Sequence, residues 1–259
     1  MKRSDLGWGI ALVVIGSILL LNRFLGVNIW RLVGPLLLIG LGLWILWPSQ
    51  MKEELAEETI HIPLEGAHRA EIHIQHGVGH LRVSASESSD VIVSGTFRGG
   101  LAYERQQQDD TLQLKMRVRS HAPWKWFSGR GFDWDTKINK ELPLELHIEG
   151  GLSENRLDLS DLQITDLHVE GGLSSTEITL PAHAGATQVY LESGLASLNV
   201  RIPEGVAARV QSESGLSSVH VDEKRFPKSG DIYLSPDFDR AENRVNIRVE
   251  SGLGSVRIG

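Results

Sequence analysis

The chain has 259 residues, enough for one large domain or two small ones. Its net charge is −7, but residues 1–50 carry +3, so the remaining residues carry −10. So acidic a region repels nucleic acid, and the sequence therefore predicts no nucleic-acid partner. Cysteine is absent, which excludes disulfides and thiol chemistry.

Two long apolar stretches dominate the first fifty residues. Residues 6–22 and 32–47 contain no charged side chain. As helices, each would span about 25 Å, near the short limit for crossing a bilayer. Tryptophans lie near the ends of these stretches, as in an interfacial aromatic belt. The sequence therefore predicts a two-helix transmembrane hairpin over residues 1–50, with the chain integral to the membrane.

Charges near the predicted hairpin favour one orientation. Lys2, Arg3 and Lys52 lie on the side of both hairpin ends, whereas Arg23 and Arg31 lie in the loop. This three-to-two bias predicts that the remainder of the chain lies on the cytoplasmic side. Residues 51–59 then form a charged connector.

Residues 60–259 alternate polar and apolar side chains, which predicts an all-β domain. The segment "LHVEGGLSSTEITL" has four close copies and a weaker sixth relative, "IHIQHGVGHLRVSA". Successive close copies are 21, 22, 21 and 37 residues apart. Such a period predicts a parallel β-solenoid with coils of ~21 residues. The tryptophan-rich residues 121–137 and residues 224–244 are inserts in this pattern.

One glycine column marks the same position in every copy. We expect two short strands joined there by a tight corner. Glycine suits such a corner because it can take a positive φ and because stacked corners leave no room for bulk. No helix pattern follows the glycines, which argues against a phosphate-binding loop. The corner glycines are Gly77, Gly151, Gly172, Gly194, Gly215 and Gly252.

The chain resembles a known family in two places. The apolar segment "LLLNRFLGVNIWRLVGPLLLIGLGL" is similar to the membrane region of LiaF-like proteins of the bacterial cell-envelope stress response. The segment "ELPLELHIEGGLSENRLDLSDLQITDLHVEGGLSSTEITLP" is similar to the toast-rack β-solenoid, a domain also labelled "putative adhesin". The resemblance implies a non-enzymatic protein in the bacterial cytoplasmic membrane that binds a membrane or envelope-stress partner and could form a homo-oligomer.

A glutamate column stands two residues before the corner glycines. If the coils stack in register, neighbouring carboxylates lie about 4.8 Å apart. Their repulsion is about 0.9 kcal/mol per pair at a dielectric constant of about 80. The column therefore predicts either a solvated acidic face or a site for a cation or a basic partner. This acidic ladder comprises Glu149, Glu170, Glu192, Glu213 and Glu250.

The aromatic insert is a second candidate interaction site. Loops are rarely so aromatic unless something covers the rings. The rings could cap an open end of the solenoid, contact the bilayer surface, or bind a protein or glycan. The candidate interaction residues are Trp124, Lys125, Trp126, Phe127, Arg130, Phe132 and Trp134.

Sites for catalysis, metals and cofactors are not predicted. His73 and His76 would point to opposite faces of a strand, and the corner would separate His80 from both. Asp133 and Asp135 share one side of an extended segment, but no further ligand lies nearby in the sequence. We therefore predict a non-enzymatic membrane-anchored scaffold or regulatory protein of the envelope-stress response. The alternative is an extracytoplasmic adhesin or glycan-binding module.

Overall fold

The computed structural model describes residues 57–119 and 132–259. All regular structure in these residues is strand, and they contain no helix able to span a membrane. The predicted fold class, a helical membrane hairpin joined to a β-solenoid, is therefore wrong as stated, and the described residues form an all-β fold instead. The two predicted helices, 6–22 and 32–47, lie outside the described residues.

The described strands form one 13-stranded sheet with the order β1-β3-β6-β2-β7-β8-β9-β13-β10-β12-β11. The strands β4 and β5 lie off this path, and β5 pairs with both β4 and β2. The bounds are β1 Glu57–Pro63, β2 Arg69–Ser86, β3 Val91–Arg98, β4 Leu101–Gln108, β5 Thr111–Val118, β6 Phe132–Asn139, β7 Pro143–Asp158, β8 Gln163–Thr179, β9 Ala186–Arg201, β10 Ala207–Val221, β11 Lys228–Ser229, β12 Ile232–Leu234 and β13 Arg244–Ile258.

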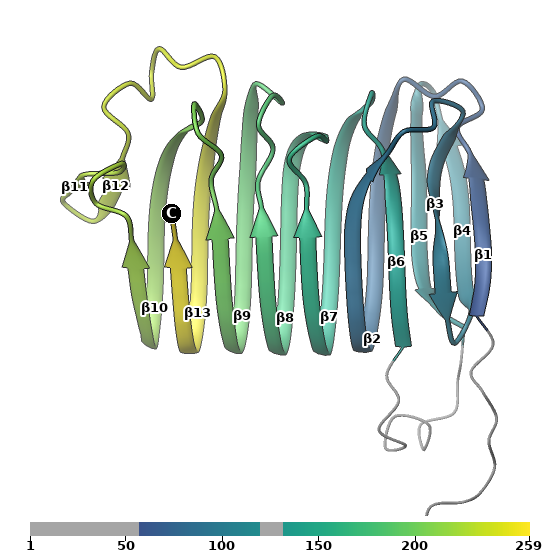
Figure 1. The fold of residues 1–259 in the computed structure, drawn as a ribbon, viewed down its shortest axis with the longest axis horizontal. Coiled ribbons are helices and arrows are strands. Elements are labelled where there is room, and N and C mark those ends of the chain that lie inside the picture. Colours follow the sequence, from purple (N-terminus) through teal and green to yellow (C-terminus); the bar gives the residue numbers. More distant parts are fainter. Residues whose placement is uncertain (1–56, 120–131) are drawn as a thin grey trace, which may run out of the picture. The chain divides into compact units, whose positions relative to one another are not determined.

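Each sequence repeat forms one long, bent strand. Figure 1 shows β2, β7, β8, β9, β13 and β10 side by side, each turning back on itself at the lower edge. The two arms of each strand form two layers that face each other. Neighbouring strands run parallel, and their pairing omits only the corner glycine: between β7 and β8, Gly150 pairs with Gly171 and Leu152 pairs with Leu173.

The predicted coil of two short strands joined by a corner is therefore corrected to one continuous strand of 15–18 residues. The reason lies in the backbone. None of the six corner glycines has a φ in the left-handed region. The chain consequently stays extended through the bend, and β pairing resumes on the next residue.

The core lies between the two layers. Its side chains come from the positions five and three residues before the corner glycine and six residues after it. In β8 these are Leu167, Val169 and Ile178, which are at most 5% exposed. Because equivalent residues pair across the strands, each position builds an apolar row that runs from β2 through β7, β8 and β9 to β13. Burial of such side chains contributes about 1.5–3 kcal/mol each.

Different strands close the two ends of the stack. At one end, the first arm of β2 pairs with β5 and the second arm pairs with β6, and antiparallel strands continue both layers. At the other end, β12 pairs antiparallel with β10 through Arg209–Gln211. The last strand, β13, is not at an end: it lies between β9 and β10. Both arms of β2 are thus paired on their outer side, while β12 covers three residues on the outer side of β10.

Candidate binding groove

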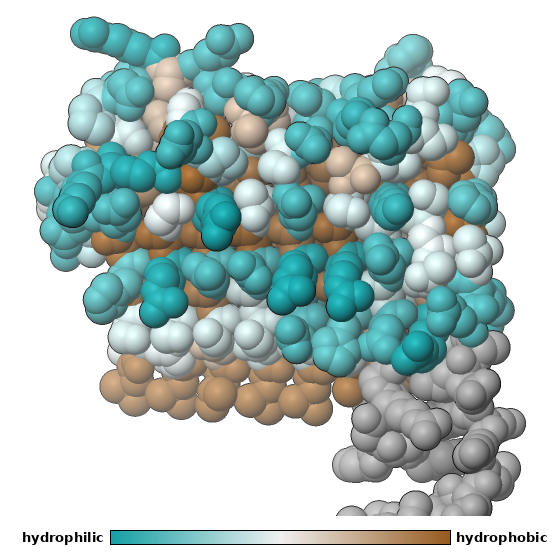
Figure 2. All heavy atoms as spheres, viewed as in Figure 1, coloured by the Kyte–Doolittle hydropathy of each residue, from teal (hydrophilic) through white to brown (hydrophobic). Residues whose placement is uncertain are grey.

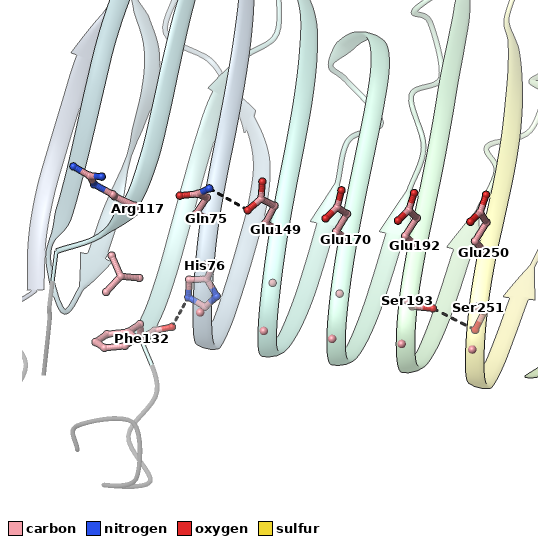
Figure 3. A pocket seen from close by; sticks show the side chains of 18 of the residues that line it. Gln75, His76, Arg117, Phe132, Glu149, Glu170, Glu192, Ser193, Glu250 and Ser251 are labelled. Carbon is pink, nitrogen blue, oxygen red and sulfur yellow. Dashed lines mark hydrogen bonds between the residues drawn. The ribbon is translucent and has the colours of Figure 1, made fainter. Parts of the chain in front are cut away.

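A groove of about 1040 Å³ crosses the bent strands close to their turning points. The corner glycines and the glutamates two residues before them line most of its length. Figure 3 shows Glu149, Glu170, Glu192 and Glu250 in a row with their carboxylates pointing the same way. Gln75, Arg117 and Phe132 line the end near β2. The groove therefore has one acidic column and a narrow floor of backbone.

The acidic ladder is in register across the stack. Glu149 pairs with Glu170, Glu170 with Glu192, Glu192 with Glu250, and Glu250 with Glu213. All five side chains are exposed. At the strand spacing of about 4.8 Å, repulsion between neighbours is about 0.9 kcal/mol in water and about 3.5 kcal/mol at an effective dielectric constant of about 20. A polar or cationic partner beside the carboxylates lowers this repulsion.

The chain supplies such partners mainly at the two ends of the ladder. Gln75 Nε2 donates to Glu149 Oε2 over 3.0 Å. At the other end, Arg248 lies 3.1 Å from a carboxylate oxygen of both Glu213 and Glu250. Among the described residues, Glu192 in the middle has no ion-pair partner. Glu192, together with Glu149 whose partner is a neutral amide, is thus a ladder carboxylate without a cation beside it among the described residues.

The groove floor depends on close backbone approach. A Cβ on Gly252 would lie 2.7 Å from the carbonyl oxygen of Gly194, and one on Gly151 would lie 2.7 Å from that of Gly77. The same contact would be 3.1 Å for Gly172, Gly194 and Gly215. Of the two reasons that the sequence offered for glycine here, crowding by the next strand holds for five of the six, with Gly77 the exception, whereas a positive φ is wrong for all six.

A row of exposed leucines follows the glycine column and forms a surface that was not predicted from the sequence. Leu152, Leu173 and Leu195 are 55%, 51% and 51% exposed, and Leu253 and Leu216 continue the row. Figure 2 shows the resulting apolar band along the lower edge of the strands. The signal was present: the residue after the corner glycine is Leu or Val in every copy. Alternation of polar and apolar residues does not predict whether this residue is buried or exposed, because the bend interrupts the two-residue period of the strand.

The aromatic insert divides between the core and the residues that are not described. Phe132 and Trp134 are 2% and 1% exposed, and Trp134 contacts Phe97 edge-on at 5.2 Å between ring centroids. These two candidate interaction residues are therefore core residues, because β6 lies between β2 and β3 and turns them inward. The other five, Trp124, Lys125, Trp126, Phe127 and Arg130, lie outside the described residues.

The histidines considered as a cluster have three different environments. His73 Nε2 lies 2.8 Å from Glu71 Oε1. His76 is buried beside Trp134, with its Nε2 2.8 Å from the carbonyl oxygen of Phe132, and burial lowers its pKa. His80 instead pairs with Asp133 over 2.7 Å. These three histidines therefore do not converge on one ion.

The two carboxylates of the "DWD" segment also have different surroundings. Asp133 pairs with His80 on one oxygen and with Arg98 on the other, at 2.7 Å each. Asp135 lies further along β6, between strands β2 and β3. Asp133 thus holds three strands together at this edge, and its oxygens are already occupied by protein donors.

The described residues form an all-β stack of in-register strands with a polar groove. The protein is therefore of the class of repeat scaffolds, in which equivalent side chains form ladders across the strands. The chain belongs to the Toast_rack_N family, the N-terminal domain of toast_rack (DUF2154), which matches residues 51–201. The predicted toast-rack resemblance is thereby confirmed. A comparison with curated proteins gives no match.

Two solved structures are similar to this chain to different degrees. A "putative cell adhesion protein" from Clostridium sporogenes is 21% identical, with a TM-score of 0.70 over 78% of this chain and 98% of that one. A "putative adhesin" from Bacteroides fragilis is 10% identical, with a TM-score of 0.29 over 82% of this chain and 99% of that one. The first likeness supports the fold.

Proposed function

We propose that this chain is a non-enzymatic scaffold of the cell envelope that holds an extended, basic segment of a partner protein in its acidic groove. The observation that carries the proposal is the in-register ladder of exposed glutamates along a groove of about 1040 Å³. A narrow floor of glycine lets a partner backbone or a long cationic side chain approach closely.

The charge distribution favours a polypeptide over a single ion. The carboxylates extend over five strands, so the negative potential is a stripe rather than a point. A stripe of one sign attracts a chain with several Lys or Arg side chains and sets its orientation. The uncompensated centre at Glu192 is where we expect the partner cation to contribute most.

The physiological setting of the proposal is the cell-envelope stress response. Its support is the resemblance of the apolar N-terminal segment to LiaF-like proteins, together with membership of the toast-rack family. In this setting, the scaffold would act by holding or releasing a regulatory partner. Cells in which the groove is neutralised should then respond abnormally to cell-wall-active antibiotics, although the protein is present at its normal level.

The binding test compares two triple variants with the same change in charge. E170Q/E192Q/E250Q neutralises the groove, whereas E204Q/E223Q/E242Q neutralises three exposed glutamates elsewhere. With a fluorescent decalysine peptide as the probe, we expect the groove variant to lose at least tenfold in affinity and the control variant to lose less than twofold. Binding of wild type should weaken as salt increases.

Equal losses in both triple variants would mean that only net charge attracts the peptide, and the groove proposal would be wrong. Unchanged binding in the groove variant would have the same consequence. Thermal unfolding of each variant provides the folding control. We expect no loss of stability in the groove variant, since it removes like-charge repulsion.

An adhesion role is the second candidate, and the Clostridium sporogenes structure is the observation that favours it. The side of the membrane separates the two roles. Because the chain has no cysteine, Ser229→Cys places a single exposed thiol in β11. We expect no labelling of intact cells by a membrane-impermeant maleimide, as for a cytoplasmic scaffold. Labelling would favour adhesion.

A further inference from the structure

A histidine column runs beside the acidic ladder, on the same arm of the strands. His73, His147 and His168 pair in register on β2, β7 and β8, each four residues before its corner glycine. The rings of His73 and His147 are stacked at 4.4 Å between centroids, with 5° between their planes. The rings of His147 and His168 are 5.7 Å apart. Backbone pairing thus places three imidazoles side by side.

Such a stack is compatible with neutral rings, because stacked imidazolium ions would repel each other. A neutral imidazole has a free lone pair on one ring nitrogen, which is the form that binds metals. When neutral, each ring of the column therefore offers one nitrogen to a metal ion.

A carboxylate completes the set at the β2 end of the column. Glu71 Oε1 lies 2.8 Å from His73 Nε2, and Glu71 Oε2 accepts a hydrogen bond of 2.9 Å from Gln113 Nε2 on β5. One ligand atom from each of Glu71, His73 and His147 lies within 4.8 Å of the others, and all three residues are half-buried. Gln113 fixes the carboxylate in the way that outer-shell groups orient metal ligands.

We propose that Glu71, His73 and His147 bind a divalent transition metal ion of the zinc class. Two imidazole nitrogens and one carboxylate oxygen suit this class, whereas calcium and magnesium prefer sets made only of oxygen. With bonds of about 2.0–2.2 Å, tetrahedral binding leaves the fourth position to water. This set differs from His73, His76 and His80, which the structure separates.

The ligands reach a common ion by side-chain rotation. Tetrahedral geometry places ligand atoms roughly 3.3 Å apart, so the present separations must shorten and the two rings must rotate out of their parallel stack. The three side chains are partly exposed, so they can turn toward solvent while the strands stay paired. The bound ion would join β2 to β7, at the junction between the antiparallel strands and the repeats.

A second cluster nearby supplies a sharp internal control. His168, Glu170 and Glu192 also place ligand atoms within 4.8 Å of one another, but this set has one imidazole and two exposed carboxylates. His168 Nε2 lies 2.9 Å from Glu170 Oε1 without forming a hydrogen bond. Variants of His147 and His168 therefore distinguish the proposed site from its neighbour.

The test is calorimetric titration of Zn²⁺ into the full chain, purified without a histidine tag and freed of metal. At pH 7.5 we expect one ion per chain at the proposed site. His147→Ala and Glu71→Gln should each weaken binding at least tenfold, while His183→Ala, which removes an exposed histidine elsewhere, should change it less than twofold. Binding should weaken at pH 5.5, because protons compete for the imidazoles.

Two further measurements separate a metal site from a structural role. Wild type should melt at a higher temperature with Zn²⁺ than without it, and His147→Ala should not, while both fold normally without metal. The Co²⁺ form should show the absorption of a tetrahedral site. Equal binding by the His147 and His183 variants would overturn the proposal. So would loss of the ion in His168→Ala when His147→Ala retains it.

Discussion

The repeat strands and the antiparallel strands at the β2 end fill their cores with different kinds of side chain. In β7, β8, β9 and β13, each core row consists of similar aliphatic residues, and the backbones approach closely at a glycine. Around β3 and β6, single large rings fill the space, chiefly Phe97, Phe132 and Trp134. Regular stacking thus requires small residues at the bend, whereas closing the stack requires bulk.

The difference has consequences for function. Repetition multiplies any exposed side chain into a row, which is how one glutamate and one leucine per repeat become an acidic ladder and an apolar band. The antiparallel strands do not repeat, so they form individual contacts such as the pairing of Asp133 with both His80 and Arg98. Binding surfaces should therefore arise in the repeats, and single mutations should be most costly at the closing end.

The largest effect is expected at the closing end. Trp134→Ala removes a fully buried indole between His76 and Phe97, so it leaves a cavity that the neighbours cannot fill. We expect the free energy of unfolding to fall by about 3–5 kcal/mol in denaturant titrations. A loss below about 1 kcal/mol would show that this end of the stack is loosely packed.

Two leucines in β9 provide the next contrast. Leu191 is 2% exposed and Leu195, four residues later, is 51% exposed. Leu191→Ala should cost about 2–5 kcal/mol, as other core leucine truncations do. Leu195→Ala should cost under about 1 kcal/mol, since much of its side chain stays in water. Similar losses for the two variants would mean that the apolar band is covered in solution.

Within the glycine column, alanine substitutions at two positions should change the stability in different directions. Gly252→Ala forces a Cβ to within 2.7 Å of the Gly194 carbonyl oxygen, so neighbouring backbone must shift at a cost of about 1–3 kcal/mol. Gly77→Ala meets nothing within 4 Å and should be neutral or stabilise by up to about 1 kcal/mol, because alanine restricts the unfolded chain. Equal destabilisation would indicate that backbone conformation, not crowding, selects glycine.

The smallest effect concerns pH. Burial lowers the pKa of His76, with the carbonyl of Phe132 and the charge of Asp133 opposing the shift and His80 adding to it. Because the folded-state pKa lies below the unfolded value of about 6.5, the stabilisation is complete above that pH and declines as pH falls below it. Burial lowers the pKa of His147 too, so it contributes in the same direction.

Melting temperature should thus fall by a few degrees between pH 7.5 and pH 5.5. His76→Gln should be less stable at pH 7.5 but should show a smaller decline across this range. If the variant and wild type decline equally, another group is responsible for the pH dependence.

The sequence by itself determined the repeat strands and their columns. Alternation fixed which side chains of β7, β8 and β9 are buried, and the constant spacing around each glycine fixed which residues pair, because strands of equal pattern bury their apolar rows only in register. The acidic ladder followed from this register. The sequence did not determine that each strand continues through its bend. A regular spacing of glycines fits a corner with a positive φ and an extended, closely packed bend equally well.

Only the tertiary structure decided the remaining features. The last repeat, β13, lies between β9 and β10, a position that spacing along the chain does not encode. Phe132 and Trp134 are buried because β6 pairs with β2 and β3, which are far away in the sequence. His73 meets His147 because β2 pairs with the distant strand β7. Local patterns specify faces of a strand, whereas the neighbour that each face meets depends on long-range pairing.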